Sequence, residues 1–557
     1  MAHDGAGHAR ETGWDVEVDV LVAGTGAAGL SAAIAAADAG AEVLVVEAGD
    51  RWGGTTMRSG GGLWMPANPV MRRRGIADSR AEALTYLAAA VGDAGPASST
   101  ARREAFVDAV PQVVTRLEEL GVRWSVAAQY PDYYPERPGG KVGRSIEPEP
   151  FDTRRLGDWI ERSRVKDGLP LPLKNDDVWL LARAWSTPGG FVRGARFVFR
   201  TLGGLVTGKK YVGMGTALAC SLMLVVREQG TRVELGSPVT ELVVEDGVVT
   251  GAVIGGERPR RVRARGGVVL GAGGFAHRTA WREKYHGVPG WSAAADGDQG
   301  TAIEAGVEAG AAVALMDDAW WGAGVDTPGD GMNGFVLSER SMPYSIVVDQ
   351  SGRRFVNEST SYIDFGHAML ERDDVAPAIP SWLVMDVRAS RRYLSTSTLQ
   401  GAQALREAGR LVKARTLAEL AEATGIDPVG LRATVQRFNG FAASGVDEDF
   451  HRGDSAYDRY YGDPTIRPNP NLGPIERGPF TALQLVPGDL GTKGGLLTDD
   501  RGAVLDEAGV PIAGLFAAGN TTASVMGRTY PGPGSTIGPA VVFGWLGGRH
   551  AAGRATA

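Results

Sequence analysis

The chain has 557 residues, of which 43% are apolar and 22% are charged, and its formal net charge at pH 7 is -7. Because this length exceeds what one hydrophobic core usually fills, we expect two domains, and because acidic and basic residues are interspersed, we expect no nucleic-acid partner. The single cysteine, Cys220, excludes an intramolecular disulfide and is typical of the reducing cytoplasm, where we expect the protein, with Cys220 buried as a small apolar residue. Neither the first residues nor any later window has an apolar run of signal-peptide or membrane-span length, so we expect a soluble protein.

The first strong motif is a strand, glycine turn and helix near the start of the chain. Residues 18–49 read VDVLVAGTGAAGLSAAIAAADAGAEVLVVEAG, and Gly24, Gly26 and Gly29 form G-x-G-x-x-G between an apolar strand and an alanine-rich helix. The first glycine permits the tight turn, the second lets backbone meet pyrophosphate, and the third lets helix pack on strand. Glu47 ends the second strand, where a carboxylate accepts ribose hydroxyls. The context predicts a dinucleotide site.

Later segments favour a flavin over a nicotinamide. Residues 50–68 (DRWGGTTMRSGGGLWMPAN) follow the motif, and apolar runs ending in glycine recur at 266–275 and 514–524 after a predicted hairpin in 231–254. Such a return of the chain to its nucleotide fold is typical of proteins that bury a whole flavin adenine dinucleotide (FAD). The residues expected to hold FAD are Gly24, Gly26, Ala27, Ala28, Gly29, Glu47, Ala48, Gly53, Gly54, Thr55, Thr56, Ser59, Gly60, Gly61, Gly62, Val239, Ala272, Gly273, Gly274, Gly519, Asn520, Ser535, Ile537 and Gly538.

This combination resembles the flavoprotein superfamily that contains fumarate reductases and 3-ketosteroid dehydrogenases, over nearly the whole chain. The resemblance implies an α/β fold: a discontinuous Rossmann-like FAD-binding domain of residues 1–318 and 492–557, with an α+β catalytic domain inserted at 319–491. Fumarate and succinate enzymes handle a dicarboxylate, and many attach flavin through a histidine beside a glycine pair. Residues 55–62 contain no histidine. The steroid branch is therefore favoured, and no metal is expected.

Three tyrosine-bearing motifs are similar to those of the steroid branch. In YPDYYPERPGG (130–140), Tyr133 stands at the position of an active-site tyrosine, with its neighbour Tyr134 as the alternative. In RRFVNESTSYIDFG (353–366), Tyr362 occupies the position of the catalytic base. In RTYPGPGSTIGPA (528–540), Tyr530 and Gly534 match the pair that binds the steroid 3-keto oxygen.

The implied reaction is 1,2-desaturation of a 3-ketosteroid. A proton leaves carbon 2 and a hydride leaves carbon 1, while the Tyr530 hydroxyl and the Gly534 N–H donate hydrogen bonds to the developing enolate oxygen. A tyrosine has a reference pKa of about 10, so Tyr362 needs help toward phenolate from Tyr133 or from positive potential. Electrons then pass from FAD to an external acceptor. Candidate aromatic walls of the substrate pocket are Trp320, Trp321, Phe335 and Phe365.

Two alternatives stay open. One is a 3-ketosteroid Δ4-(5α)-dehydrogenase of the same superfamily, although the PDYY segment favours Δ1 chemistry. The other is a flavoprotein that only carries electrons.

Three further segments have no motif of their own. Residues 416–445 repeat apolar residues at helical spacing, which indicates core. Residues 450–475 predict an ordered loop over the substrate pocket, with Tyr457, Tyr460 and Tyr461 as surface stacking residues. Residues 150–211 predict a lid or an apolar surface patch, and loose membrane association stays open because steroids partition into membranes.

Overall fold

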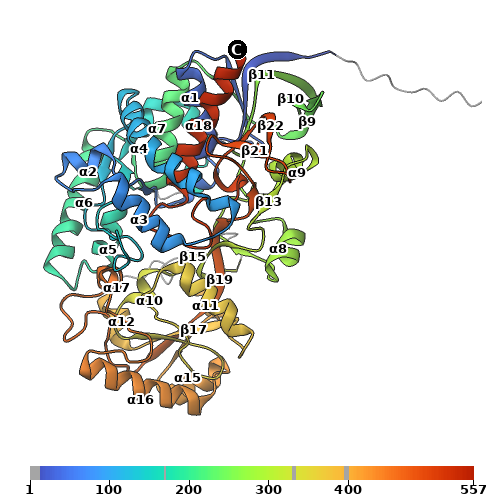
Figure 1. Cartoon of the computed structure of the whole chain (residues 1–557). Coiled ribbons are helices and arrows are strands. Elements are labelled where there is room, and N and C mark those ends of the chain that lie inside the picture. Colours follow the sequence, from blue (N-terminus) through green and yellow to red (C-terminus); the bar gives the residue numbers. More distant parts are fainter. Residues whose placement is uncertain (1–12, 168–170, 329–333, 394–400, 557) are drawn as a thin grey trace, which may run out of the picture.

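The computed structural model describes residues 13–167, 171–328, 334–393 and 401–556 (Figure 1). Residues 1–12, over which the sequence predicts no signal peptide, lie outside the described residues. Among the helices of the described part, none is long and apolar enough to cross a membrane.

The upper part of the molecule in Figure 1 is built on an eight-stranded sheet. Its path runs β21-β22-β11-β1-β2-β8, in which β22, β11, β1, β2 and β8 pair parallel and β21 pairs antiparallel with β22; the antiparallel hairpin β9–β10 joins it through β11. The strands are β1 Val16–Ala23, β2 Val43–Val46, β8 Arg232–Glu234, β9 Val239–Glu245, β10 Val248–Ile254, β11 Arg260–Leu270, β21 Ala503–Leu505 and β22 Pro511–Ala517.

Alternate residues of a strand point to opposite faces of a sheet, and in this sheet both faces are buried. Val20 and Val22 of β1 join one hydrophobic cluster, and Leu21 joins the other. Four helices cover the first face: α1 Ala27–Asp38, α4 Thr100–Glu119, α7 Met214–Glu228 and α18 Ile537–Ala555. The second face is covered by α9 Thr301–Glu308 and the β9–β10 hairpin. Cys220 lies on α7 and is fully buried, as predicted.

The lower part of the molecule holds a seven-stranded sheet ordered β15-β14-β19-β17-β16, with β12 and β18 also paired to β19. Its long strand β19 spans Phe480–Thr492 and leads back to the upper part. The other strands are β12 Trp291–Ser292, β14 Ala319–Val325, β15 Gly334–Phe335, β16 Ser345–Val348, β17 Ser381–Met385 and β18 Leu411–Ala414. On this basis we propose the domain boundaries expected from the sequence, at 318/319 and 491/492.

Helices and short strands complete the two parts. The upper part also has α2 Pro69–Arg73, α3 Arg80–Val91, α5 Asn175–Ala182, α6 Pro188–Val206 and α8 Thr279–His286, with short strands β3 Leu63–Trp64, β4 Trp124–Val126, β5 Ser145–Pro148, β6 Phe151–Asp152, β7 Tyr211–Val212, β13 Val313–Ala314 and β20 Gly495–Leu496. The lower part has α10 Ser338–Ser341, α11 Tyr362–Asp373, α12 Val387–Arg392, α14 Ala402–Glu407, α15 Leu417–Thr424, α16 Pro428–Ser444 and α17 Ala456–Tyr461.

Several sequence predictions can be checked directly. The strand-helix-strand unit at 18–49 and the hairpin predicted within 231–254 are confirmed, with the turn between Glu245 and Val248. The periodic segment 416–445 forms α15 and α16, and its periodic residues pack in one core cluster as predicted: Leu417, Leu420, Ile426, Leu431, Val435 and Phe438. The prediction for 450–475 was wrong in part: Tyr457 and Tyr461 lie on α17 and are buried. The Tyr457 ring packs on Tyr133, and the Tyr461 ring packs on Tyr457 and Tyr130.

Candidate active site

A cavity of about 440 Å³ lies at the carboxyl ends of the parallel strands β1, β2, β11 and β22. The cavity is lined by residues that end these strands or follow them by one or two positions: Ala23, Val46, Gly271 and Gly519. This edge of an open parallel sheet is where such folds bind ligands, and the volume suits a small-molecule site. The three glycine runs predicted from the sequence therefore meet at one place.

The first glycine motif forms one wall of the cavity. Gly24 has φ +101°, and a Cβ there would lie 2.4 Å from the Gly271 carbonyl oxygen, so only glycine fits this turn. A Cβ on Gly26 would have the Thr56 Oγ1 as its nearest neighbour at 3.5 Å, which leaves this backbone open to the cavity. Helix α1 begins next to it, and although the Ala27 N–H donates to the Thr56 hydroxyl at 2.9 Å, the N-cap residue Gly26 makes no side-chain cap, so the following N–H groups can donate to a diphosphate.

Glu47 follows β2 and lines the same cavity. Its carboxylate accepts hydrogen bonds from the Thr25 N–H at 3.0 Å, the Thr25 hydroxyl and the Gly49 N–H at 3.0 Å. These contacts fix a carboxylate at the end of the second strand, where a ribose hydroxyl can reach it. The glycine cradle, the uncapped helix and this acid fit the diphosphate and ribose of FAD.

Most of the predicted cofactor residues line the cavity, and five do not. Gly29 lies inside the fold, where a Cβ would come 2.0 Å from the Gly24 carbonyl oxygen, so its role is to let α1 pack on β1. Gly53, Gly274 and Gly538 are each crowded by a neighbouring side chain or backbone atom, and Ser535 is buried with its hydroxyl bonded to the Gly532 carbonyl. The residues inside the lining are Gly24, Gly26, Ala27, Ala28, Glu47, Ala48, Gly54, Thr55, Thr56, Ser59, Gly60, Gly61, Gly62, Val239, Ala272, Gly273, Gly519, Asn520 and Ile537.

Four charged lining residues were not found by sequence reasoning. Asp298 is buried beside Thr55, whose hydroxyl donates to it at 3.2 Å. Burial raises the pKa of Asp298 to about 7, while hydrogen bonds with Thr55 and the Gly274 backbone oppose the shift. Arg58, Arg164 and Glu339 are the other three, and Arg164 pairs with Asp296 at 2.8 Å. The only sequence signal for Asp298 is its place in a glycine-rich loop before α9.

Three tyrosines from distant segments meet at the other end of the cavity. Tyr133, Tyr362 and Tyr530 line it together, with ring centroids 5.1 Å apart for Tyr133–Tyr530, 5.4 Å for Tyr133–Tyr362 and 4.7 Å for Tyr362–Tyr530. Phe335 packs against Tyr362 at 5.5 Å and also lines the cavity. The structure thus brings the predicted tyrosines to one ligand-sized space beside the glycine cradle.

The pair Tyr133 and Tyr134 divides between two environments. Tyr133 faces the cavity, whereas the Tyr134 hydroxyl donates to the Asp364 carboxylate at 3.0 Å. Of the two, Tyr133 is the one that lines the cavity. Of the four candidate aromatic walls, Phe335 lines the cavity; Trp320 packs edge-on against Tyr530 at 5.1 Å, and Trp321 and Phe365 belong to the core.

The tyrosine hydroxyls have perturbed acidity. Burial raises the pKa of Tyr362 well above its ordinary value, Tyr530 raises it further, and a hydrogen bond with Tyr133 opposes the shift. Burial also raises the pKa of Tyr530, against hydrogen bonds from Thr536, Tyr362 and the Gly534 backbone. Tyr530 therefore keeps its proton and can donate it in a hydrogen bond, and the Gly534 amide lies beside its hydroxyl.

Gly534 has a backbone that no other residue could adopt without strain. Its φ is +93°, and a Cβ would lie 2.2 Å from the Gly62 carbonyl oxygen. The loop before it is held by the buried Lys493, whose ammonium group donates to the Gly527 and Thr529 carbonyls at 2.7 Å and lies over the Trp320 ring. Lys493 is a positioning residue that sequence reasoning missed.

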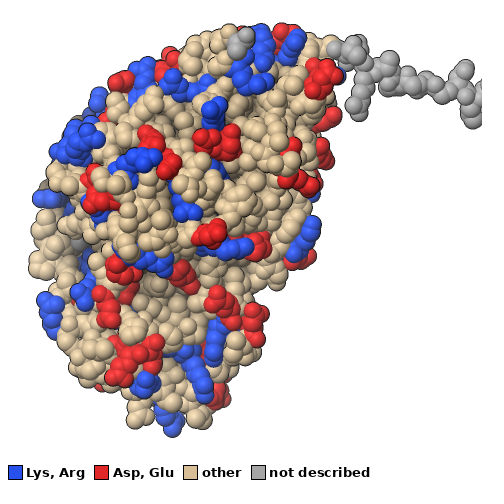
Figure 2. Space-filling model, viewed as in Figure 1, with Lys and Arg blue, Asp and Glu red and all other residues tan. Residues whose placement is uncertain are grey.

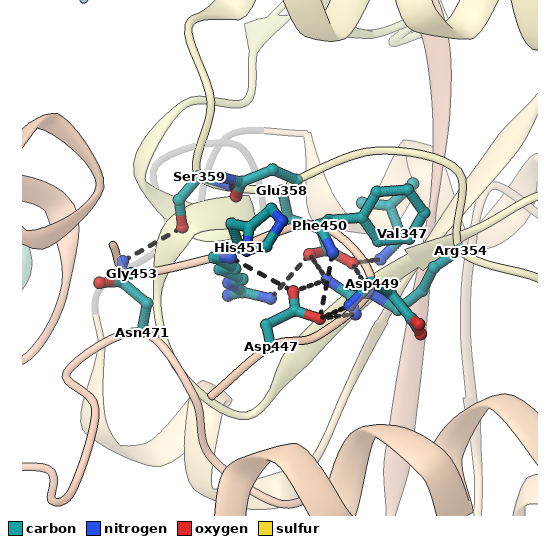
Figure 3. Close-up of polar contacts among 12 residues, drawn as sticks. Val347, Arg354, Glu358, Ser359, Asp447, Asp449, Phe450, His451, Gly453 and Asn471 are labelled. Carbon is teal, nitrogen blue, oxygen red and sulfur yellow. Dashed lines mark hydrogen bonds and ion pairs between the residues drawn. The ribbon is translucent and has the colours of Figure 1, made fainter. Parts of the chain in front are cut away.

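A buried ion-pair network fixes the segment that leads to Tyr362 (Figure 3). Arg354 pairs with Glu358 and with Asp447, both at 2.7 Å, and Arg452 reaches Glu358 at 3.2 Å. Burial alone raises the pKa of Glu358 and of Asp447, but the neighbouring guanidinium groups outweigh burial and hold both pKa values below their ordinary range. The network joins the loops that precede α11 and α17. Tyr362 is the first residue of α11, and α17 carries Tyr457 and Tyr461.

The sequence matches a family described as FAD binding domain over residues 19–537. The chain belongs to this FAD-binding family. It is 46% identical over 555 residues to a 3-oxosteroid 1-dehydrogenase of Mycolicibacterium smegmatis, an alignment that covers 95% of this chain and 96% of the relative. It is 36% identical over 569 residues to a 4-oxocyclohex-2-ene-1-carboxylate 5-dehydrogenase of Sinomonas cyclohexanicum, covering 97% of this chain and 95% of the relative.

A solved structure is similar over the same length. The chain matches the crystal structure of a 3-ketosteroid Δ1-dehydrogenase from Sterolibacterium denitrificans, in complex with 1,4-androstadiene-3,17-dione, with a TM-score of 0.90 and 36% identity, covering 96% of this chain and 99% of that chain. These matches confirm the resemblance and the α/β FAD-binding fold inferred from the sequence.

Proposed function

We propose that the chain is an FAD-dependent 3-ketosteroid Δ1-dehydrogenase of steroid breakdown, which converts a substrate such as 4-androstene-3,17-dione to 1,4-androstadiene-3,17-dione. The observation that carries the proposal is one cavity lined at one end by the glycine cradle and at the other by Tyr133, Tyr362, Tyr530 and Gly534. The 3-oxosteroid 1-dehydrogenase relatives support it.

The first task of the site is to polarise the substrate ketone. The Tyr530 hydroxyl and the Gly534 N–H lie side by side and are both donors, so together they can bind the C3 oxygen as it gains negative charge. Because burial keeps Tyr530 protonated, this donor is present throughout the neutral range.

The second task is removal of the carbon 2 proton. We assign this role to the Tyr362 oxygen, and the hydrogen bond from Tyr133 is what stabilises its phenolate form against the effect of burial. When bound, FAD supplies the acceptor for the hydride that leaves carbon 1, so the substrate loses one proton and one hydride and gains the 1,2 double bond. An external acceptor must then reoxidise the cofactor.

The cavity favours a steroid over a ring carboxylate of the kind named for the Sinomonas cyclohexanicum relative. The carboxylate of such a substrate, on the ring carbon opposite the ketone, needs a cation in the substrate part of the cavity, but the lining cations Arg58 and Arg164 lie near Asp167 and Asp296. The rest of the cavity lining includes four apolar residues and one acid: Val178, Leu337, Leu490, Phe335 and Glu339. This composition suits a neutral, apolar substrate.

The test is product analysis with the FAD-loaded enzyme and a saturated 5α-3-ketosteroid. The proposal predicts a 1-ene product. A 4-ene product without any 1-ene would establish the Δ4-(5α) alternative. If the enzyme converts neither this steroid nor 4-androstene-3,17-dione, only the electron-carrier alternative would remain.

A further inference from the structure

Three charged side chains are buried together next to Tyr133. The Arg144 guanidinium pairs with the Asp132 carboxylate at 2.6 Å and with the Asp78 carboxylate at 2.9 Å. Each of these side chains is at most 1% exposed, and none of the three is among the residues that line the cavity. Asp132 is the acid of the PDYY segment and directly precedes Tyr133. We call Asp78, Arg144 and Asp132 the ionic triad.

The ionic triad differs from the ion pairs of the surface. Figure 2 shows acidic and basic side chains interspersed over one face of the molecule, where water screens them. The buried triad depends instead on its hydrogen bonds, because an unpaired buried charge is costly. The Asp132 carboxylate also accepts from the Trp64 indole N–H at 2.8 Å and from the Lys141 backbone N–H at 3.0 Å. Burial raises the pKa of Asp132 to about 6, against the effects of Arg144 and Trp64, so this carboxylate is charged at pH 8.

The ionic triad is connected to the Pro531 carbonyl, in the loop that carries the ketone donors. This carbonyl accepts hydrogen bonds from the Tyr133 N–H at 2.9 Å and from the Tyr86 hydroxyl at 2.5 Å. Asp132 is the chain neighbour of the first donor, and the Arg144 guanidinium carbon lies 5.2 Å from the ring centroid of the second. Both donors are therefore attached to the ionic triad or packed on it.

The Pro533 carbonyl is anchored by Ser145, which directly follows Arg144 in the chain. The Ser145 side chain is buried, and its hydroxyl donates to this carbonyl at 2.6 Å. The Pro533 carbonyl and the Gly534 N–H belong to one planar peptide group. A bond that fixes the carbonyl therefore also fixes the direction in which the Gly534 N–H donates, and it polarises the peptide so that this N–H is a better donor.

Trp64 joins the ionic triad to the same loop through both of its N–H groups. Its indole N–H donates to Asp132, and its backbone N–H donates to the Gly534 carbonyl at 3.1 Å. The indole also contacts Gly532 closely, since a Cβ there would lie 2.4 Å from the Trp64 Cδ1. The loop from Tyr530 to Gly534 is thus held at three carbonyl oxygens by residues that adjoin the ionic triad.

We propose that the ionic triad and Ser145 position the two donors that bind the substrate ketone, the Tyr530 hydroxyl and the Gly534 N–H. Neither the triad nor Ser145 lines the cavity, so these are positioning residues that act through the loop. An oxyanion donor is effective only while its distance and direction are fixed, and a displacement of about 1 Å can cost about 10²-fold in rate. This inference rests on the proposed function.

The test is isotope-edited infrared spectroscopy of the oxidised, FAD-loaded protein at pH 8. The probe is 1,4-androstadiene-3,17-dione labelled with ¹³C at carbon 3, which already has the 1,2 double bond and therefore does not react. Hydrogen bonds to a carbonyl lower its stretching frequency. We expect the wild type to shift the C3 carbonyl band below its position in an aprotic solvent.

Two variants weaken the positioning without touching the donors. Asp132→Asn removes a charge at constant size, and Ser145→Ala removes one hydroxyl; both should move the C3 carbonyl band back toward higher frequency. Flavin reduction by 4-androstene-3,17-dione should slow by about 10²-fold in Asp132→Asn. In Ser145→Ala it should slow by about fivefold, which corresponds to one neutral hydrogen bond. If Asp132→Asn does not retain FAD, the band position in Ser145→Ala decides the question.

The matched control is Asp386→Asn, which breaks a pair with Arg388 at 2.7 Å. Asp386 is as buried as Asp132 but lies outside the cavity lining. This control should lose stability yet keep the wild-type band position and reduction rate. Wild-type band positions in both Asp132→Asn and Ser145→Ala would overturn the inference alone, as would an equal band shift in Asp386→Asn. A wild type that neither shifts the band nor is reduced by the steroid would overturn the proposed function, and the inference with it.

Discussion

The chemistry of the site depends on a few groups whose ordinary properties are changed by burial. Tyr362 and Tyr530 have the same side chain and both pKa values are raised, yet we assign them opposite roles. Hydrogen bonds lower the pKa of both, from Tyr133 to Tyr362 and from Thr536, Tyr362 and the Gly534 backbone to Tyr530, so acidity does not separate them. What separates them is that Tyr530 lies beside the Gly534 amide, the second donor. The two roles follow from position within the cluster.

Replacing Tyr133 with phenylalanine should move the pH dependence of flavin reduction. Because the pKa of Tyr362 is raised by burial, its phenolate fraction and the reduction rate should increase with pH above neutrality. Removal of the Tyr133 hydroxyl takes away a group that lowers this pKa, so the rising limb of the profile should shift to higher pH. Stopped-flow reduction from pH 6 to 10 measures it, and an unshifted limb with a uniformly lower rate would contradict the assigned role.

Substituting Gly534 by alanine should disable the donor pair. The added Cβ would lie 2.2 Å from the Gly62 carbonyl, so the loop must shift and the amide must leave its place beside Tyr530. Loss of one such donor typically costs about 10²–10³ in kcat. The control is Gly509→Ala, at φ +77° with no atom within 4 Å, which carries similar backbone strain far from the site and should retain kcat. Comparable kcat losses in both variants would contradict the account.

At the scale of elements, close packing of small residues explains how the FAD-binding layer is built. Helices α1 and α18 meet at backbone distance: a Cβ on Gly544 would lie 2.3 Å from the Ala28 carbonyl, and one on Gly548 would lie 2.2 Å from the Ala32 carbonyl. The start of α1 and the start of α18 both reach the cavity, so this contact sets the spacing of two of its walls.

Gly548→Ala should therefore destabilise the protein by about 1–3 kcal/mol, because the added methyl group forces the two helices apart. Gly553→Ala is the matched control on the same helix, since nothing lies within 4 Å of its Cβ position. Its expected effect is a gain of up to about 1 kcal/mol from better helix propensity. Both are measured by thermal unfolding of the FAD-loaded protein, and equal midpoints for the two variants would contradict the packing argument.

The ion-pair network should make the lower part of the molecule sensitive to acid. The folded pKa values of Glu358 and Asp447 lie below their unfolded values of about 4.3 and 3.9, so their stabilisation is complete above those values and is lost as pH falls. Asp447→Asn should cost about 3–5 kcal/mol at pH 7, and its difference from the wild type should shrink at acid pH.

The control for this substitution is Asp449→Asn, which breaks an exposed pair with Arg437. A surface pair contributes about 0–1 kcal/mol, so its unfolding midpoint should stay near that of the wild type at every pH. A difference between Asp447→Asn and the wild type that is unchanged from pH 7 down to about pH 2, below the unfolded pKa of an aspartate, would count against the network's role.

Across the whole molecule, the sequence predicted local elements and motifs better than it predicted their surroundings. The strand-helix-strand unit, the hairpin and the periodic helices follow from spacing alone, and the position of Glu47 follows with them. Asp298 and Lys493 could not be predicted, because their importance depends on burial and on partners that lie far away along the chain. Tyr457 and Tyr461 were misjudged for the same reason: a loop rich in aromatics does not reveal which rings turn inward.

The central claim is that one cavity couples FAD to a tyrosine site for a 3-ketosteroid. Its most direct test is anaerobic mixing of the FAD-loaded wild type with 4-androstene-3,17-dione, with flavin absorbance followed by stopped flow and the product identified. The account predicts rapid bleaching with formation of 1,4-androstadiene-3,17-dione, and a reduction rate at least about 10²-fold lower for Tyr530→Phe with flavin content unchanged. Bleaching at the same rate in wild type and Tyr530→Phe, or no bleaching of the wild type, would contradict it.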